Sequence, residues 1–143
     1  MKQDMPERAE RPARAKNNRT VLAFDFGLKR IGVAVGEPEL RTAHPLPAIA
    51  APGFDAISKL ITEWQPAQIV VGLPIAANGE HPLAKRVERF ARQLEGRFRL
   101  PVARVDERYT SVEAESRLRG AKNKSVDSVA AQLILEQYFD QAA

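Results

Sequence analysis

The sequence predicts an α/β domain of three layers, in which helices flank a mixed central β-sheet. Two observations lead to this expectation. Two β-type runs, at residues 21–26 and 31–36, are separated by only four residues, and helical and extended patterns alternate along the chain after them. A short connection favours an antiparallel hairpin, and alternating helices and strands are typical of α/β folds. The length of 143 residues fits one domain.

The first 19 residues have a different character from the rest of the chain. They contain two prolines, six basic and three acidic side chains, and no apolar periodicity. Such a segment cannot bury enough apolar surface to fold. We therefore expect residues 1–19 to form a disordered basic arm and residues 20–143 to form a single folded domain.

The strands of the hairpin are followed by a weaker one. Residues 27–30 form the connection of the hairpin, and residues 42–50 read as a third strand that carries Pro45 and Pro47. Because proline cannot donate a backbone hydrogen bond, these two residues confine that segment to a sheet edge or a loop.

The remaining elements follow from hydrophobic periodicity and from turn residues. An apolar stripe from Phe54 to Trp64 predicts a helix after Pro52-Gly53, and another from Leu83 to Leu94 predicts a second helix. Asn78-Gly79 between them signals a turn. We expect strands at residues 68–71 and 101–105, a short helix at 110–119, a polar loop at 120–124 and a last helix at 126–139.

Composition and charge exclude several classes of protein. No run approaches the about 18 uninterrupted apolar residues of a membrane span, and the start of the chain does not resemble a signal peptide, so the expected location is the cytoplasm. The absence of cysteine excludes disulfides and a thiolate zinc site. Residues 85–124 hold 12 basic and 6 acidic side chains, an excess that suggests a phosphate-rich partner.

Three carboxylates stand at the ends of predicted elements. Asp25 closes the apolar run at 21–24, Glu107 follows the strand at 101–105, and Asp127 opens the last helix. Asp127 shares a helical face with Ala130, Ala131 and Ile134. Because a charge beside the core is costly without a partner, and because residues at strand ends can converge, a shared metal ion would compensate all three.

Four motifs then carry a resemblance to a known family. They are Asp25-Phe-Gly-Leu-Lys-Arg-Ile-Gly-Val-Ala34, Val70-Val-Gly-Leu-Pro74, Asp106-Glu-Arg-Tyr-Thr-Ser-Val-Glu-Ala114 and Asp127-Ser-Val-Ala-Ala131. In order and spacing the chain resembles the YqgF (RuvX) family over about residues 20–139. Asn78 and Ser111 depart from the usual Asp and Thr of that pattern and preserve turn or capping ability.

The resemblance implies a ribonuclease H-like fold related to RuvC and a metal-dependent nuclease. By motif position, the catalytic residues that hold Mg²⁺ or Mn²⁺ are Asp25, Glu107 and Asp127. Alternation along a strand sends Asp106 and Glu107 to opposite faces, so one of them is a ligand. Glu107 is favoured and Asp106 is the alternative.

Basic residues near these carboxylates are candidates for nucleic-acid contact. Lys29 and Arg30 lie in the hairpin turn, and Arg108, Lys122 and Lys124 lie near the other two motifs. A stripe of Lys85, Arg89 and Arg92 on the second helix reads either as a solvated face or as a further contact. His44 and His81 read as surface or loop residues.

The resemblance implies structured RNA as the substrate, with 5′-end maturation of pre-16S ribosomal RNA, in the precursor rRNA or particle, as the role. Alternatives are a Holliday-junction resolvase acting on branched DNA and a non-catalytic ribosome-assembly or transcription factor. An actin-like ATP-binding fold would need a second domain, for which the chain is too short. We expect a monomer or weak dimer and no membrane partner.

Overall fold

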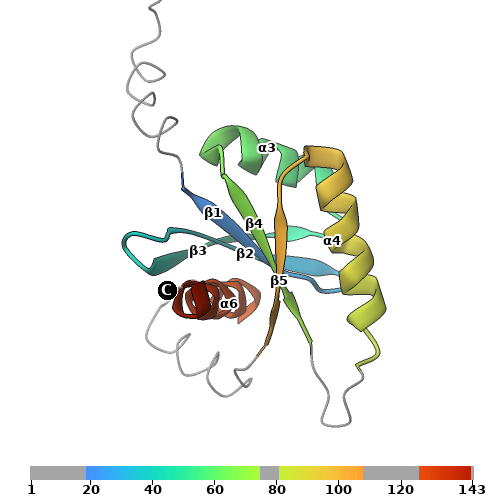
Figure 1. Cartoon of the computed structure of the whole chain (residues 1–143). Helices are drawn as coiled ribbons and strands as arrows, with labels where there is room; N and C mark the ends of the chain where they lie inside the picture. Colours follow the sequence, from blue (N-terminus) through green and yellow to red (C-terminus); the bar gives the residue numbers. More distant parts are fainter. Residues whose placement is uncertain (1–18, 75–80, 108–125, 143) are drawn as a thin grey trace, which may run out of the picture.

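A computed structural model describes residues 19–74, 81–107 and 126–142, with only the backbone described at 126, 127 and 142. Figure 1 shows the arrangement of the elements. The strands are β1 (Val21–Asp25), β2 (Arg30–Glu37), β3 (Thr42–Ala50), β4 (Gln68–Leu73) and β5 (Val102–Asp106). The helices are α3 (Phe54–Trp64), α4 (Ala84–Phe98) and α6 (Val126–Ala142).

The five strands form one mixed sheet in the order β3-β2-β1-β4-β5. β1 pairs antiparallel with β2, and β2 pairs antiparallel with β3. β1 pairs parallel with β4, and β4 pairs parallel with β5. The predicted hairpin and mixed sheet are confirmed, and the proline-bearing strand β3 lies at an edge of the sheet, where missing backbone donors are tolerated.

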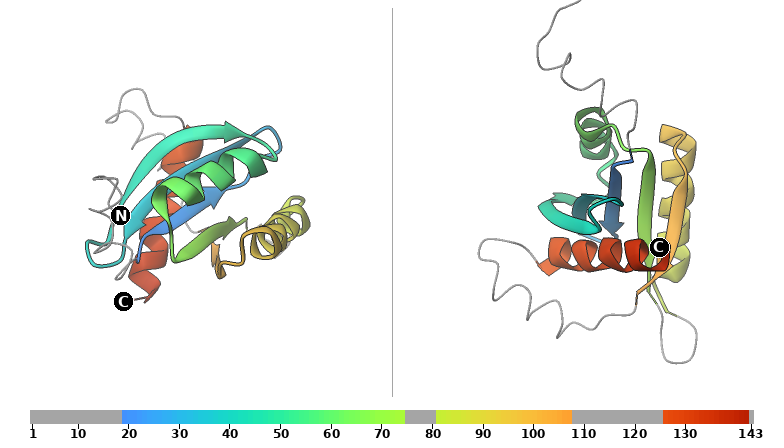
Figure 2. Two further views of the ribbon diagram at one scale, coloured as in Figure 1. Left: turned by 90° about the horizontal axis from the view of Figure 1, so that it is seen from above. Right: turned by 60° about the vertical axis from the view of Figure 1, so that its left-hand side comes forward.

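Helices cover both faces of the sheet. Residues of α3 and α4 pack into one buried cluster with the sheet, and residues of α6 pack into a second cluster. The two views of Figure 2 show α6 on the side of the sheet opposite α3 and α4. The fold therefore has the three layers that the sequence predicts.

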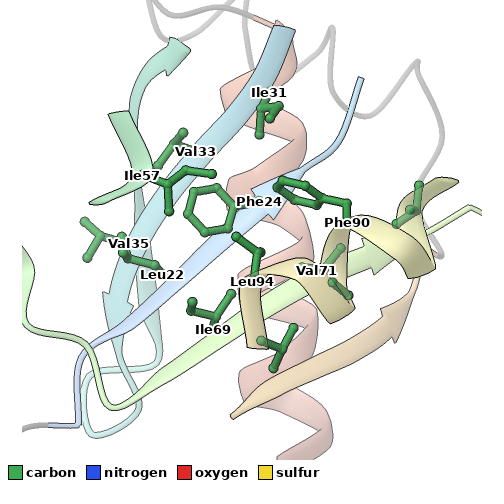
Figure 3. Packing of buried hydrophobic residues seen from close by; sticks show 13 residues of the cluster. Leu22, Phe24, Ile31, Val33, Val35, Ile57, Ile69, Val71, Phe90 and Leu94 are labelled. Atoms are coloured by element: carbon green, nitrogen blue, oxygen red, sulfur yellow. The ribbon is translucent and has the colours of Figure 1, made fainter. Parts of the chain in front are cut away.

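The layer beneath α3 and α4 is built from large apolar side chains. Leu22 and Phe24 of β1 meet Ile57 of α3 and Phe90 of α4, and all four are buried. The rings of Phe24 and Phe90, which are labelled in Figure 3, pack edge to face. Their centroids are 6.3 Å apart. Aromatic pairs of this geometry contribute beyond the area they bury, so this layer is the main source of stability.

The layer beneath α6 uses smaller side chains. Ala23 and Ala34 of the central strands pack with Ala131 and Ile134 of α6. Small residues on the strands allow the helix to approach the sheet closely. Ala131 and Ile134 are two of the three residues that the sequence places on one helical face with Asp127, and their burial against the strands shows that this face meets the sheet.

Several predicted features fall outside the described residues. These are the arm at 1–18, the Asn78-Gly79 turn, the short helix at 110–119 and the loop at 120–124. Arg19, which the sequence assigns to the arm, makes an ion pair with Glu39 at 2.7 Å. Within the described parts of the chain, no helix is long and apolar enough to cross a membrane.

Candidate active site

Two of the three predicted carboxylates lie at the same edge of the sheet. Asp25 is the last residue of β1, and Glu107 directly follows β5. Because β1, β4 and β5 run parallel, their carboxyl ends meet at one edge. The Glu107 amide donates to the Leu73 carbonyl at 2.9 Å, which extends the pairing of β4 and β5 to this residue.

Asp25 and Glu107 also share a face of the sheet. Val21 and Ala23 of β1 and Val105 of β5 are buried in the cluster beneath α6. Since side chains alternate along a strand, Asp25 and Glu107 belong to that same face, and both are half-buried. The site therefore lies on the α6 side of the sheet.

Gly72 of β4 lies between the two carboxylates. Phe24 pairs with Val71, so the register continues to Asp25 beside Gly72, and Gly72 itself pairs with Val105. A Cβ at Gly72 would collide with Ile134 Cδ1 and would lie 3.2 Å from Glu107 Cγ. The Glu107 side chain thus lies over β4, on the side of the sheet that Asp25 shares.

A second glycine flanks Asp25 on its other side. Gly32 of β2 pairs with Asp25, so the Asp25 carboxylate stands in a cross-strand row between two residues that have no side chain. Neighbouring strands are about 4.8 Å apart, which separates β1 and β5 by roughly 10 Å. Side chains from Asp25 and Glu107 can extend toward each other across that interval. Sequence reasoning did not identify this row, because the order and register of the strands are needed to align Gly32, Asp25 and Gly72.

Asp106, the alternative to Glu107, has a different environment. Its side chain is exposed, and alternation places it on the face opposite Glu107. The Asp106 carbonyl accepts a hydrogen bond from Gln137 Nε2 of α6. Asp106 therefore helps to hold α6 by its backbone, while Glu107 turns its side chain to the Asp25 side.

Asp127 lies in the first turn of α6, and its side chain is outside the described atoms. The next residue fixes this end of the helix. Ser128 Oγ accepts a hydrogen bond from the Val33 amide at 3.3 Å and donates one to the Leu46 carbonyl. Val33 follows Gly32, the partner of Asp25, so the start of α6 is anchored close to the Asp25 end of β1.

The anchor coincides with an irregularity in the sheet. The register of β2 and β3 shifts between Ile31 and Val33, a bulge that interrupts the regular ladder there. The Ser128 hydroxyl bonds the Val33 amide at this point and ties α6 to both strands. A further bond, from Gln132 Nε2 to the Ala43 carbonyl at 2.9 Å, holds the next turn of the helix on β3.

Basic residues border the Asp25 end of the site. Lys29, in the turn between β1 and β2, and Arg30, the first residue of β2, are exposed. The turn is fixed by the Lys29 carbonyl, which accepts from the Ala51 amide at 2.9 Å, and by Gly27, where a Cβ would lie 2.5 Å from the Arg30 carbonyl oxygen. Arg108, Lys122 and Lys124, the other predicted contacts, lie outside the described residues.

Among the described side chains, no group of three acidic or histidine residues is close enough to hold a metal ion, a search that does not include Asp127. The histidines stand elsewhere. His44 is exposed on β3, and His81 Nδ1 accepts from the Leu83 amide at 3.1 Å before α4. Any metal at this edge would thus be held by carboxylate oxygens, which suit Mg²⁺ and Mn²⁺.

A hollow of about 560 Å³ lies at the other end of β1, lined by residues that include Val21, Gln68 and Phe139. It is distant from the carboxylates, because Val21 and Asp25 are the two ends of the strand. The carboxylates instead lie at the carboxyl ends of the parallel strands β1 and β5.

Comparison with solved structures supports the architecture. Thermus thermophilus RuvC in complex with a Holliday junction is similar with a TM-score of 0.56 at 12% identity, covering 87% of this chain and 96% of that one. The resolvase of fowlpox virus with its Holliday junction substrate is similar with a TM-score of 0.56 at 9% identity, covering 86% and 98%. At such identities the likeness shows the fold, which is that of RuvC and ribonuclease H.

Comparison of sequences gives the family. A protein of Nitrosomonas europaea named "Putative pre-16S rRNA nuclease" is 54% identical over 132 residues, covering 85% of this chain and 89% of its own. One of Methylobacillus flagellatus with the same name is 53% identical over 150 residues, covering 97% and 99%. The RuvX family, described as Holliday junction resolvase, matches residues 19–141. The chain therefore belongs to the RuvX family.

Proposed function

We propose that this protein is a divalent-metal-dependent nuclease that hydrolyses phosphodiester bonds in structured RNA. The observation that carries the proposal is the placement of Asp25 and Glu107 on one face and one edge of the sheet, on either side of Gly72. These two carboxylates form a set of oxygen donors at the carboxyl ends of parallel strands, beside the core side chain of Ile134 that packs over Gly72.

The residues would divide the work as follows. Asp25 and Glu107 would hold the metal from the sheet, and Asp127 would complete the set from α6, whose start is anchored by Ser128. When bound, a divalent ion supplies Lewis acidity that activates water and stabilises charge on the leaving oxygen. The rigid strand ends keep the carboxylates in position, so no reorganisation is needed at the moment of reaction.

The set fits a hard cation. Carboxylate oxygens are the ligands that Mg²⁺ and Mn²⁺ prefer, and the glycines at positions 32 and 72 place no side chain next to Asp25 in its row. Lys29 and Arg30, exposed at the start of β2 and in the turn before it, would contact phosphates of the bound strand.

For the biological substrate we propose the precursor of 16S ribosomal RNA, with maturation of its 5′ end as the role and the cytoplasm as the location. The support is the shared name of relatives that are about half identical to this chain over nearly its whole length. Cleavage of branched DNA is the second candidate, because the family description and the RuvC likeness both refer to Holliday junctions. A resolvase would need two sites in a dimer.

We also propose that residues 1–19 are an electrostatic arm and not part of the active site. The family match begins at residue 19 and β1 begins at Val21, which supports a boundary near Thr20. Deleting residues 1–19 is expected to leave the maximal cleavage rate unchanged and to raise the RNA concentration needed for half-maximal rate, most clearly at low salt.

One experiment tests the function directly. Purified protein is incubated with labelled pre-16S RNA and with a labelled four-way DNA junction, each with Mg²⁺, with Mn²⁺ or with EDTA. We expect cleavage of the RNA that requires metal and is lost in the Asp25→Asn variant. Cleavage of the junction alone would replace the proposal by the resolvase, and binding without cleavage under all conditions would replace it by a non-catalytic assembly factor.

A further inference from the structure

The outer face of α4 carries a concentration of positive charge that the active site does not use. Six basic side chains of the helix and its last cap are exposed: Lys85, Arg86, Arg89, Arg92, Arg97 and Arg99. We call these six residues the α4 basic surface. Within the described parts of the chain, Lys85, Arg86, Arg89 and Arg99 have no acidic partner.

The two acidic residues of α4 are bound by a cation of the sheet, and Glu88 also pairs with Arg92 of this surface at 3.8 Å. Glu88 and Glu95 are two turns apart, and both bind the guanidinium of Arg104 on β5, with the shortest N–O distances at 2.8 Å and 2.6 Å. The hydrogen bond from Arg104 lowers the pKa of Glu95, and the two carboxylates raise the pKa of Arg104. Both acids of the helix therefore bind the sheet residue Arg104, while Arg92 pairs with Glu88, Arg97 lies 4.0 Å over the ring of Phe54, and the other four cations face solvent.

Helix α3, which covers the same face of the sheet, provides the contrast. Its exposed charges are Asp55, Lys59 and Glu63, spaced four residues apart with alternating signs. Such a pattern is what an ordinary solvated helix face shows. The unbalanced charge of α4 is thus a property of that helix and not of this side of the molecule.

The α4 basic surface begins beside the active-site edge. The N-terminus of α4 follows β4, whose carboxyl end is at the edge where Asp25 and Glu107 lie. From there the helix runs back along the sheet for roughly 21 Å, and Figure 1 shows its first turn near the tips of β4 and β5. Lys85 and Arg86 are in that first turn, and Arg97 and Arg99 are at the far end.

The chemistry of the surface favours the sugar-phosphate backbone of a nucleic acid over other partners. The aromatic residues of α4 do not lie on its exposed face, since Phe90 is buried and Phe98 is half-buried, so the surface offers no platform for stacking unpaired bases. The large hydrophobic side chains that are exposed in the described parts of the chain, Leu28 and Leu40, lie outside α4, so the helix has no apolar face to insert into lipid.

We propose that the α4 basic surface binds the sugar-phosphate backbone of a base-paired RNA stem that flanks the bond to be cut. Recognition of double-stranded RNA depends on shape and phosphate contacts, which a straight helix lined with cations can supply. The inference rests on the proposed nuclease function and adds a second point of attachment, on the opposite face of the sheet from the carboxylates but continuous with their edge.

The test compares two variants that remove two positive charges each. Lys85→Gln with Arg89→Gln alters the α4 basic surface, and Lys59→Gln with Arg41→Gln alters exposed cations elsewhere. The first pair makes no ion pair within the described residues, so the melting temperature is expected to stay unchanged. Binding is measured in EDTA, where no metal-dependent turnover occurs, with a fluorescent RNA stem-loop, an unpaired RNA of equal length and phosphatidylglycerol vesicles.

We expect the α4 variant to bind the stem-loop about tenfold more weakly at low salt. The plot of log affinity against log salt should become less steep, by the amount that corresponds to the loss of roughly two phosphate contacts. The control variant should change affinity less than about twofold, an ordinary effect of distant surface charge. Binding of the unpaired RNA should change little. Maximal cleavage at saturating RNA should remain.

Equal weakening by both variants, equal weakening for paired and unpaired RNA, or vesicle binding that depends on Lys85 and Arg89 while stem binding does not, would each overturn the proposal. The failure of the proposed function would look different. A protein that binds the stem through α4 but cleaves no nucleic acid with any metal would contradict the nuclease and retain the binding surface.

Discussion

The two faces of the sheet are built in different ways from the same strands. Beneath α3 and α4, β1 presents Leu22 and Phe24 to a layer of large apolar side chains. Beneath α6 the same strand presents Val21, Ala23 and then Asp25 to a layer with more alanine, and to a helix that is also held by polar bonds. Because side chains alternate along β1, Leu22 and Phe24 contribute to the large apolar layer on one face, and Asp25 belongs to the candidate active site on the other.

The largest expected effect is on the cleavage rate, which should depend on Asp25 of the α6 face. Asp25→Asn should lower the cleavage rate by at least about two orders of magnitude, the size of effect seen when a group that stabilises transition-state charge is lost. Its melting temperature should change little, because asparagine keeps the size and shape of the side chain at this half-buried position. Single-turnover cleavage and thermal unfolding measure the two quantities.

Asp106→Asn is the matched control for this change, because Asp106 is exposed at the same edge but on the opposite face. It should retain most of the activity. A loss from Asp106→Asn as large as that from Asp25→Asn would contradict the selection of Glu107 by its face.

The next effect is on the free energy of unfolding, which is compared for one residue on each face of the sheet. Phe90→Ala should lower the free energy of unfolding by about 3–5 kcal/mol, because Phe90 is buried and contacts the rings of Phe24, Phe26 and Phe54. Cleavage per folded molecule should be unchanged.

Ile134→Ala on the α6 face should reduce both the free energy of unfolding and the cleavage per folded molecule, because Ile134 lies over Gly72 beside Glu107. Urea titration and cleavage at low urea would distinguish the two variants.

A smaller effect is expected at the anchor of α6. Ser128→Ala removes the hydroxyl that bonds the Val33 amide and the Leu46 carbonyl, and should cost about 1–3 kcal/mol because both groups lose a buried partner. Activity should fall as well, since this bond fixes the helix turn that carries Asp127. Ser58→Ala on the exposed face of α3 is the control and should change neither quantity. Full activity in Ser128→Ala would show that the anchor is structural only.

The smallest effect concerns pH. Because the Arg104 hydrogen bond lowers the pKa of Glu95 below its usual 4.5, the ionised carboxylate stabilises the fold above that pH. The contribution is lost as pH falls through the lower, folded value. The stability difference between wild type and Glu95→Gln should therefore shrink below about pH 4.5. Urea midpoints at several pH values measure it, and an unchanged difference would contradict the pairing. The effect is small, because 40% of the Glu95 side chain is exposed.

The sequence was sufficient to predict the elements that follow from periodicity. The stripe from Phe54 to Trp64 forms α3, the two short β runs form the hairpin of β1 and β2, and Pro45 and Pro47 mark an edge strand. For the site, the position of Asp25 and Glu107 at strand ends was also predicted from the sequence. Their convergence at one edge depends on strand order, which the fold supplies.

Features that depend on contacts between distant segments could not be predicted in this way. Ser128 meets Val33 and Leu46 over separations of 95 and 82 residues, and nothing local in the sequence indicates that pairing. Gly72 carries no side chain, so its place between two carboxylates is visible only once three strands are aligned. Arg104 reads as one more cation in a basic segment until its two acidic partners on α4 are seen.

The anchoring of α6 has a consequence for the order in which the molecule opens. β1 has paired neighbours on both sides, whereas β3 has one. Amide hydrogens of β1 should therefore exchange with solvent only on global unfolding, and those of β3 should exchange through partial openings. Ser128 and Gln132 of α6 both donate to carbonyls of β3. An opening of the edge strand β3 would break these two bonds to α6, while the bond from the Val33 amide of β2 to Ser128 remains and Asp25 stays fixed on the central strand.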